Sequence, residues 1–150
     1  MREEILWYYI SMKNPKDEKE MIEIYEKLDE VARKNKIEDT KYINIVDLRK
    51  LELVVDEEMI PVLKLGILIP KEKRFNGCEY LKIGECFRVN HQDSYISLNT
   101  TYKNIDRYIK KTKYRKLGYS IEFMKELAIP TENGIGGIIE IVIPVTKINN

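Results

Sequence analysis

The segments Leu65-Gly66-Ile67-Leu68-Ile69-Pro70 and Ile139-Glu140-Ile141-Val142-Ile143-Pro144 align without a gap, and they end the two halves of the 150-residue sequence. Each is a short apolar run rich in β-branched residues, a composition typical of a buried strand. A match this short is weak evidence for an internal repeat by itself. It gains weight because the elements before each segment follow the same order.

In the first half, residues 5–12 are aromatic and β-branched, which predicts a strand. Helix signals follow at once, with Asn14 suited to the N-cap and apolar residues recurring at three- and four-residue steps over 15–35. Two further strands are predicted at about 41–50 and 61–70. The first half therefore has the order β-α-β-β.

In the second half the order starts again after a polar loop that ends in Asn76-Gly77. Residues 79–90 have strand character, residues 97–112 have helical spacing, and strand signals return at 119–128 and 137–146. The second half therefore also predicts β-α-β-β.

The repeated order predicts an α+β fold in a single domain that spans 1–150. We expect two β-α-β-β modules, about 5–70 and 79–146, each an antiparallel sheet covered by one long helix. The junction between the modules would leave a groove, which is a common place for a small-molecule site.

The composition narrows the classes of function. The sequence has 26 basic and 25 acidic residues, largely interleaved, so a nucleic-acid-binding surface is unsupported. Cys78 and Cys86 lack the partners of a zinc site or a disulfide framework, and no metal or cofactor is predicted. No segment has the character of a signal peptide or a membrane span, so the cytoplasm is the expected compartment and no membrane partner is expected.

Glu140 is the most informative position, because alternation along its strand places it with Ile138 and Val142 while isoleucines form the other face. A buried, unpaired carboxylate costs several kcal/mol, so it needs a cation, donors, a proton or water. One interpretation is an edge strand whose Glu140 points to solvent or pairs with a lysine. The other places Glu140 at the floor of the groove, where it neutralises a ligand.

Other candidate motifs give no catalytic site. His91 is the only histidine, and the spacing of a nucleophile elbow is missing, so we interpret it as a solvated or capping residue. Gly134, Gly136 and Gly137 lead into a strand and lack the lysine of a phosphate loop, which favours a hairpin. No catalytic residue is predicted.

Two motifs together resemble the GyrI-like effector-binding family, which provides the ligand-binding domain of MerR- and AraC-type regulators and also occurs as free-standing proteins. They are Ile138-Ile-Glu-Ile-Val-Ile-Pro-Val145, similar to the closing strand of the family with its glutamate, and His91-Gln-Asp-Ser-Tyr95-Ile-Ser-Leu98, similar to the segment before its second helix. The resemblance implies two β-α-β-β modules related by a pseudo-two-fold, with ligands in the groove between them.

The resemblance also implies the chemistry of that groove. In the multidrug-sensing members a central glutamate pairs with flat, lipophilic cations between tyrosine walls. Carried over by position, the glutamate is Glu140, and the tyrosines are Tyr25 and Tyr42. Further expected walls are Tyr9, Tyr95, Tyr119, Phe123 and Met124.

The leading hypothesis is therefore a small-molecule binding or sensing domain of a transcriptional regulator or of a free-standing relative. It needs no catalysis, and DNA binding would belong to a fused or associated domain, since no helix-turn-helix precedes residue 5. One alternative is a hydrolase of small electrophiles that uses Glu140 as general base. Another is an inhibitor module that binds a partner protein.

Overall fold

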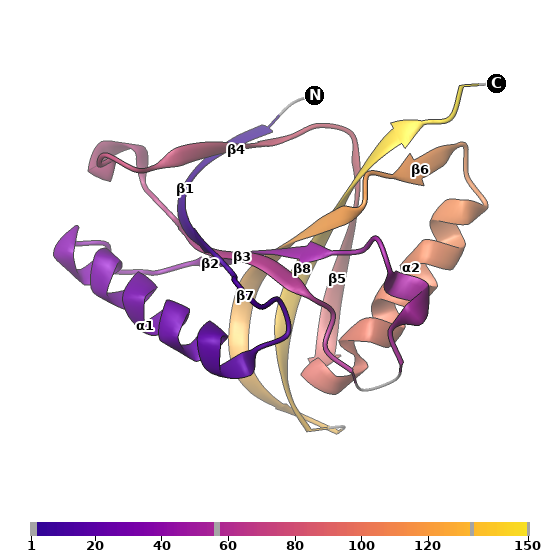
Figure 1. Ribbon diagram of the computed structural model, residues 1–150, viewed down its shortest axis with the longest axis horizontal. Helices are drawn as coiled ribbons and strands as arrows, with labels where there is room; N and C mark the ends of the chain where they lie inside the picture. Colours follow the sequence, from indigo (N-terminus) through magenta and orange to yellow (C-terminus); the bar gives the residue numbers. More distant parts are fainter. Residues whose placement is uncertain (1–2, 56–57, 133, 150) are drawn as a thin grey trace.

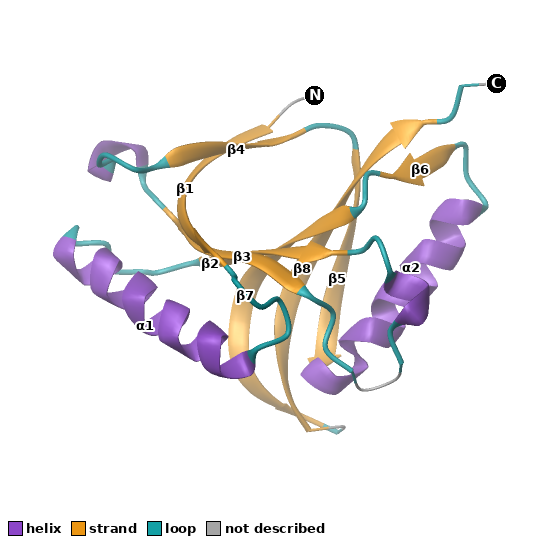
Figure 2. Ribbon diagram, viewed as in Figure 1, coloured by secondary structure: helices purple, strands orange, loops and turns teal. Residues whose placement is uncertain are grey.

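The computed structural model describes residues 3–55, 58–132 and 134–149. Its strands form one continuous antiparallel sheet, not two separate sheets as predicted (Figures 1 and 2). The order across the sheet is β4-β1-β3-β2-β7-β8-β5, and β6 pairs with β8. The strands are β1 (Glu3–Ser11), β2 (Tyr42–Asp47), β3 (Val62–Leu68), β4 (Glu79–Ile83), β5 (Cys86–Ser94), β6 (Tyr114–Lys116), β7 (Tyr119–Thr131) and β8 (Gly134–Lys147).

The α+β class is confirmed, and the first half has the predicted order β1-α1-β2-β3, whereas the second half has two additional strands and reads β4-β5-α2-β6-β7-β8. In the first half the pairing runs β1-β3-β2, and in the second it runs β7-β8-β5, so that β2 and β7 join the halves. The aligned segments of the sequence fall on β3 and β8, each of which is the middle strand of its half. The pseudo-two-fold relation itself stays a prediction.

The predicted strand over 79–90 is wrong, because the chain breaks it at Gly84-Glu85 into β4 and β5. These strands lie at opposite ends of the strand order, where β4 pairs with β1 and β5 pairs with β8. A connection of two residues can join them only if the sheet curls strongly, as Figure 1 shows. β6 is a further strand that the sequence patterns missed.

Helices α1 (Glu18–Lys34) and α2 (Leu98–Lys110) flank the sheet (Figure 1). α1 begins three residues later than the predicted Asn14 cap would place it. Asp17 is the N-cap, and its carboxylate accepts hydrogen bonds from Lys19 N at 3.0 Å and Glu20 N at 3.2 Å. Asn14 instead donates its backbone amide to Glu20 at 2.8 Å. Neither described helix has the length and apolar character needed to cross a membrane.

Contrary to the prediction, His91 is neither solvated nor a helix cap, because it is buried and the N-cap of α2 is Ser97, with no side-chain cap bond. The His91 side chain is buried, and Nε2 lies 2.9 Å from the carbonyl oxygen of Ser94. Because a carbonyl can only accept, Nε2 donates this bond, and Nδ1 accepts from the hydroxyl of Thr101 at 2.8 Å. The single histidine therefore ties β5 to the first turn of α2.

The two faces of the sheet carry different cores. The face toward the helices packs α1 and α2 residues such as Leu28 and Ile105 against strand residues such as Leu65 and Ile141. The other face is lined by strand side chains alone within the described chain. Its buried members are Trp7, Ile43, Ile45, Ile83, Ile121 and Val142, with half-buried Tyr9, Tyr119 and Phe123 packed against them.

Candidate ligand-binding site

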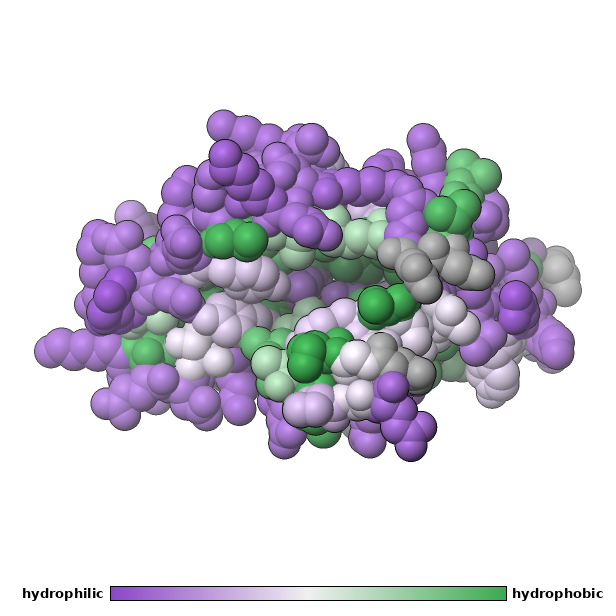
Figure 3. Space-filling view, turned by 90° about the horizontal axis from the view of Figure 1, so that it is seen from below, coloured by the Kyte–Doolittle hydropathy of each residue, from purple (hydrophilic) through white to green (hydrophobic). Residues whose placement is uncertain are grey.

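A cavity of about 640 Å³ opens on the helix-covered face of the sheet. Figure 3 shows the hollow from below, with apolar side chains around it. It lies where α1, β2 and β7 meet the residues before α2. The lining residues are Glu18, Met21, Tyr25, Tyr42, Asn44, Val46, Glu58, Met59, Ile60, Val62, Tyr95, Ile96, Leu98, Asn99, Glu122, Met124, Leu127, Ala128 and Ile139.

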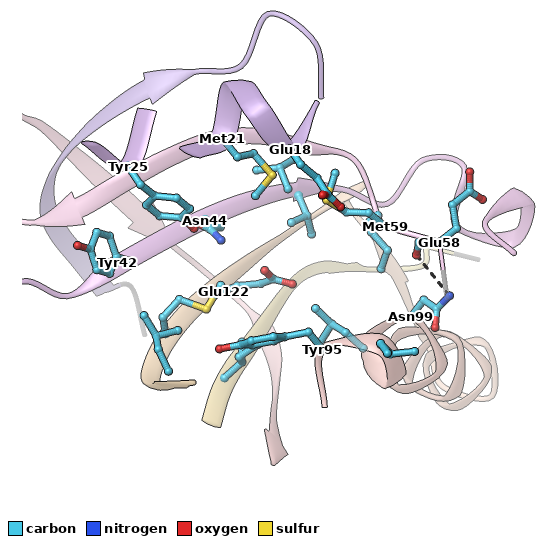
Figure 4. A pocket seen from close by; sticks show the side chains of 18 of the residues that line it. Glu18, Met21, Tyr25, Tyr42, Asn44, Glu58, Met59, Tyr95, Asn99 and Glu122 are labelled. Atoms are coloured by element: carbon cyan, nitrogen blue, oxygen red, sulfur yellow. Dashed lines mark hydrogen bonds between the residues drawn. The ribbon is translucent and has the colours of Figure 1, made fainter. Parts of the chain in front are cut away.

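Glu122 and Asn44 form the polar part of the cavity wall, and both are 3% exposed. They are register partners on β7 and β2, so the seam between the two halves brings them together. In Figure 4, Glu122 lies between Tyr25 and Asn44 on one side and Tyr95 on the other. A ligand in the cavity would meet this carboxyl group.

Burial raises the pKa of Glu122 to about 7, even though hydrogen bonds from Tyr102 and Asn44 oppose the shift. The Tyr102 hydroxyl donates to Glu122 Oε2 at 2.7 Å from α2. The same hydroxyl lies 2.7 Å from Ser120 Oγ. Glu122 is therefore a buried carboxyl group that exchanges its proton near neutral pH.

The α1 side of the cavity is a pair of tyrosines in edge-to-face contact, with ring centroids of Tyr25 and Tyr42 5.2 Å apart. The Tyr25 hydroxyl donates to Asn44 Oδ1 at 3.3 Å, and burial raises the pKa of Tyr25. The Tyr42 hydroxyl donates to Asp29; burial and this bond raise the pKa of Tyr42. Both tyrosines are therefore neutral at physiological pH and present apolar rings.

Tyr95 forms the opposite wall, and a bulge in β7 holds it in place. The register of β7 against β8 shifts between Met124 and Glu126 and again before Ile129. Within this bulge Ala128 has a positive φ of 56°, and its amide donates to the Tyr95 hydroxyl at 3.2 Å. At Gly137 a Cβ would lie 2.3 Å from the Glu126 carbonyl oxygen and 3.0 Å from the Tyr95 hydroxyl. A side chain at position 137 would therefore collide with the β7 backbone and crowd the Tyr95 hydroxyl, and glycine avoids both contacts.

The cavity lining is acidic, with no basic side chain among the described lining residues. It includes the carboxylates of Glu18, Glu58 and Glu122, and none of the described lining residues is lysine, arginine or histidine. Glu18 and Glu58 are exposed at the α1 end, where Glu58 pairs with Lys16 at 3.0 Å. Three methionines, Met21, Met59 and Met124, supply adaptable apolar surface.

Four of the eight residues predicted for the site line this cavity: Tyr25, Tyr42, Tyr95 and Met124. The other four do not line it. Phe123, Tyr119 and Tyr9 pack on the helix-free face of the sheet. Phe123 and Met124 are adjacent in β7 and therefore point to opposite faces, so both could not line one cavity.

Glu140 is also on the helix-free face, and its expected place at the floor of this cavity is wrong. Its predicted alternation is correct, because Ile139 and Ile141 face the helices while Val142 faces away. Glu140 accepts a hydrogen bond from Arg88 at 3.1 Å, and Arg88 also pairs with Glu3 at 2.9 Å. The carboxylate therefore has a cationic partner from β5. This resembles the interpretation in which Glu140 pairs with a lysine, except that the partner is an arginine.

Glu122 is the site residue that sequence reasoning missed. It lies in Ile121-Glu122-Phe123, a carboxylate between two apolar residues, which is the signal that singled out Glu140. On β7 the neighbours on its own face, Ser120 and Met124, do not form an apolar run. The apolar pattern around Glu140 is more uniform than that around Glu122, so it gave the stronger sequence signal.

The remaining motifs have structural places. Gly136 is an unavoidable glycine, because a Cβ would lie 1.9 Å from the Asp93 carbonyl oxygen of β5. The glycines thus belong to the β7–β8 hairpin, as predicted. Cys78 and Cys86 are free thiols. Within the described ranges no group of three or more His, Cys, Asp or Glu side chains is arranged to hold a metal ion.

Comparisons with known proteins give the fold a precedent. No protein-family model matches the sequence, and no curated protein matches it. Among solved structures, a chain in the cryo-EM structure of the EcmrR–DNA complex in EcmrR-RPo is similar, with a TM-score of 0.65 at 15% identity. The match covers 99% of this chain but only 56% of that one.

A hydrolase encoded by lin2189 from Listeria innocua is also similar, with a TM-score of 0.61 at 11% identity. Here the match covers 97% of this chain and 91% of the hydrolase. At such low identity the two likenesses show the fold alone. This fold therefore occurs both in a protein bound to DNA and in a protein described as a hydrolase.

Proposed function

We propose that this chain binds a flat, lipophilic organic cation in the cavity and that Glu122 is its charge partner. One observation carries the proposal: a carboxyl group that is 3% exposed faces a cavity of about 640 Å³ whose described lining contains no basic side chain. A buried carboxylate is stabilised by a nearby cation. The cation would also be attracted by the exposed carboxylate of Glu18.

The walls suit a flat guest. Tyr25, Tyr42 and Tyr95 present aromatic rings, and a cation against such a ring gains roughly 0.5 to 2 kcal/mol. Methionine side chains adapt to guests of different outline. The expected ligand therefore combines a positive charge with an extended apolar body and is not a metal ion or a phosphate.

The biological setting follows from the resemblance to GyrI-like domains and from the shared fold with EcmrR, which was solved with DNA. We propose that the chain is the ligand-sensing part of a transcriptional regulator, or a free-standing relative, related in its halves by a pseudo-two-fold. DNA contacts would be made by another segment or another protein. This chain matches only 56% of the EcmrR chain, which agrees with that division of labour.

The test compares two ligands of the same shape, N-methylacridinium, a cation, and N-methylacridone, which is neutral. Glu122→Gln should weaken the cation roughly tenfold or more and leave the neutral compound unaffected, because only the cation loses a charge partner. Glu140→Gln is the matched control, since it makes the same chemical change on the other face. Isothermal titration at neutral pH gives the affinities. Equal losses for both ligands, or a larger loss in Glu140→Gln, would refute the proposal.

A hydrolytic function has one supporting observation, because a carboxyl group with a pKa of about 7 can act as general base toward water. The described lining offers no serine, threonine, cysteine or histidine as nucleophile. Turnover of activated small esters or epoxides that Glu122→Gln abolishes and Glu140→Gln preserves would establish it. Saturable cation binding without turnover would support the sensing function and contradict the hydrolytic one.

A further inference from the structure

Two fully buried hydroxyl groups lie behind Glu122, outside the cavity lining. Tyr102 Oη is 2.7 Å from Glu122 Oε2 and 2.7 Å from Ser120 Oγ. Tyr102 and Ser120 are both 0% exposed. We call Ser120, Tyr102 and the Glu122 carboxyl group the hydroxyl chain. It connects α2 to the carboxyl group that a ligand would meet.

The hydroxyl chain can carry its hydrogen bonds in either direction, because each hydroxyl has one hydrogen and can also accept. When Glu122 is ionised, Tyr102 donates to it and Ser120 donates to Tyr102. When Glu122 is protonated, its O–H donates to Tyr102 Oη, and Tyr102 donates to Ser120 Oγ. In both states the Tyr102 hydrogen has an acceptor, so the Tyr102 hydroxyl is satisfied whether Glu122 is ionised or protonated.

The other groups that face Glu122 cannot reverse in this way. Asn44 of β2 donates to Glu122, but its Oδ1 is already the acceptor for Tyr25 of α1. The neighbours of Glu122 on β7 and β8 in the cavity lining, Met124 and Ile139, do not ionise. Tyr95 contributes an aromatic ring, and the acidic side chains of Glu18 and Glu58 are exposed.

We propose that Tyr102, acting through the hydroxyl chain, determines which ligand charge the cavity accepts. With Glu122 ionised the cavity takes a flat cation, and with Glu122 protonated it takes a flat neutral molecule of the same shape. The proposal rests on the proposed function, in which Glu122 is the charge partner. Tyr102 is a positioning residue, because it reaches the ligand only through Glu122.

Two substitutions should move the pH dependence in opposite directions. Tyr102→Phe removes a donor to the ionised carboxylate, so a higher pH is needed to ionise Glu122 and to bind the cation. Ser120→Ala removes the other partner of the Tyr102 hydroxyl, so Tyr102 must donate to Glu122, and this bond is stronger when the carboxyl group is ionised. The pH midpoint for cation binding should therefore fall. General loosening of the fold would not produce opposite shifts.

The experiment measures the affinities of N-methylacridinium and N-methylacridone between about pH 5.5 and 8.5, where a group with a pKa of about 7 titrates. The proteins are wild type, Tyr102→Phe, Ser120→Ala and the control Tyr108→Phe, which alters an exposed ring on the same helix. In wild type the affinity for the cation should rise with pH and that for the neutral compound should fall. At pH 7, Tyr102→Phe should weaken the cation roughly five- to tenfold, and Tyr108→Phe should match wild type.

The outcomes separate the two proposals. Opposite midpoint shifts in Tyr102→Phe and Ser120→Ala support the hydroxyl chain. Unchanged midpoints in both variants, or a shift in the same direction, overturn it while cation binding that depends on Glu122 still stands. If Tyr102→Phe does not fold, the downward shift in Ser120→Ala decides. Failure of wild type to bind either compound overturns the proposed function and this inference together.

Discussion

Asn44 and Glu122 lie directly opposite each other on β2 and β7, the strands that join the two halves of the sheet. Each accepts a hydrogen bond from a tyrosine of one helix: Tyr25 of α1 donates to Asn44 at 3.3 Å, and Tyr102 of α2 donates to Glu122 at 2.7 Å. Both halves and both helices therefore meet at one polar pair in the cavity wall. A ligand bound there would act on all four elements at once.

Glu122 should make the stability of the protein depend on pH. Its pKa is raised from 4.5 to about 7 in the folded protein, so the folded state holds this proton more tightly than the unfolded state. Stability is therefore lost as the pH rises from about 4.5 to about 7, by roughly 3 kcal/mol in total. Glu122→Gln removes this penalty.

Urea unfolding of wild type and Glu122→Gln at about pH 5 and pH 8 measures the effect. The variant should gain stability relative to wild type at the higher pH. Other carboxylates also make stability depend on pH: Arg49 lowers the pKa of Asp47, and Lys116 and Lys110 lower the pKa of Asp106. Their contributions are the same in wild type and variant, so they cancel when the two proteins are compared at one pH. A difference that is the same at both pH values contradicts a raised pKa for Glu122.

Glu140 should be nearly dispensable for stability. Its ion pair with Arg88 is partly exposed, with side-chain exposures of 26% and 38%, so solvent screens the attraction. Glu140→Gln should reduce the free energy of unfolding by less than about 1 kcal/mol. Chemical denaturation checks this, and a loss several times larger would mean that the Glu3–Arg88–Glu140 contact supports the curl of the sheet.

Gly136 should tolerate no side chain. An alanine Cβ would lie 1.9 Å from the carbonyl oxygen of Asp93 and 2.6 Å from the Cα of Ser94, so β5 and β8 would have to separate. Gly136→Ala should cost on the order of 3 kcal/mol or more. At Gly84 the added Cβ meets nothing within 4 Å, and Gly84→Ala should stay within about 0.5 kcal/mol of wild type. Similar thermal midpoints for the two variants would contradict this packing.

Replacing Lys36 with glycine should stabilise the folded protein. Lys36 follows α1 with a positive φ of 57°, and the amide of Ile37 donates to the carbonyl of Ala32 at 2.9 Å, as in a Schellman motif. A side chain at such a φ costs about 1 to 2 kcal/mol, of which the greater freedom of unfolded glycine cancels a part.

Lys36→Gly should therefore raise the free energy of unfolding by about 0.5 to 1 kcal/mol. Lys34→Gly, inside the last turn of α1, should lower it, because glycine is a poor helix former. The pair is compared by denaturation, and stabilisation by both substitutions, or by neither, would be inconsistent with this helix end.

Much of the fold could be predicted because its signals are local. The apolar spacing of Ile24, Leu28 and Ala32 shows the buried stripe of α1, and the alternation around Ile141 shows a two-faced strand. The corner at Gly84-Glu85 was missed because residues on both sides of it have strand character. Its bend depends on pairing with β1 and β8, and those partners are distant in the sequence.

Only half of the predicted site residues line the cavity, because the sequence does not show which face of the sheet the helices cover. The alternation of side chains along a strand places Glu140 and Ile141 on opposite faces of the sheet, but it does not identify the face that the helices cover. Placing the helices requires knowing that Ile139 and Ile141 pack with α1 and α2, which is tertiary information. Tyr25 and Tyr42 were predicted from the resemblance to the GyrI-like family, not from a local pattern. Glu122 was missed because its position in the site depends on pairing with Asn44 of β2, which is distant in the sequence.

The ionisation of Glu122 is the most direct test of the central claim. Carbon-13 NMR of glutamate carboxyl groups, assigned by comparison with Glu122→Gln, follows this group through a pH titration. We predict a pKa of about 7 in the free protein, a clearly lower pKa with bound N-methylacridinium, and no lowering with N-methylacridone. A pKa near 4.5 in the free protein, or one that the cation leaves unchanged, would contradict the assignment of Glu122 as the charge partner of the ligand.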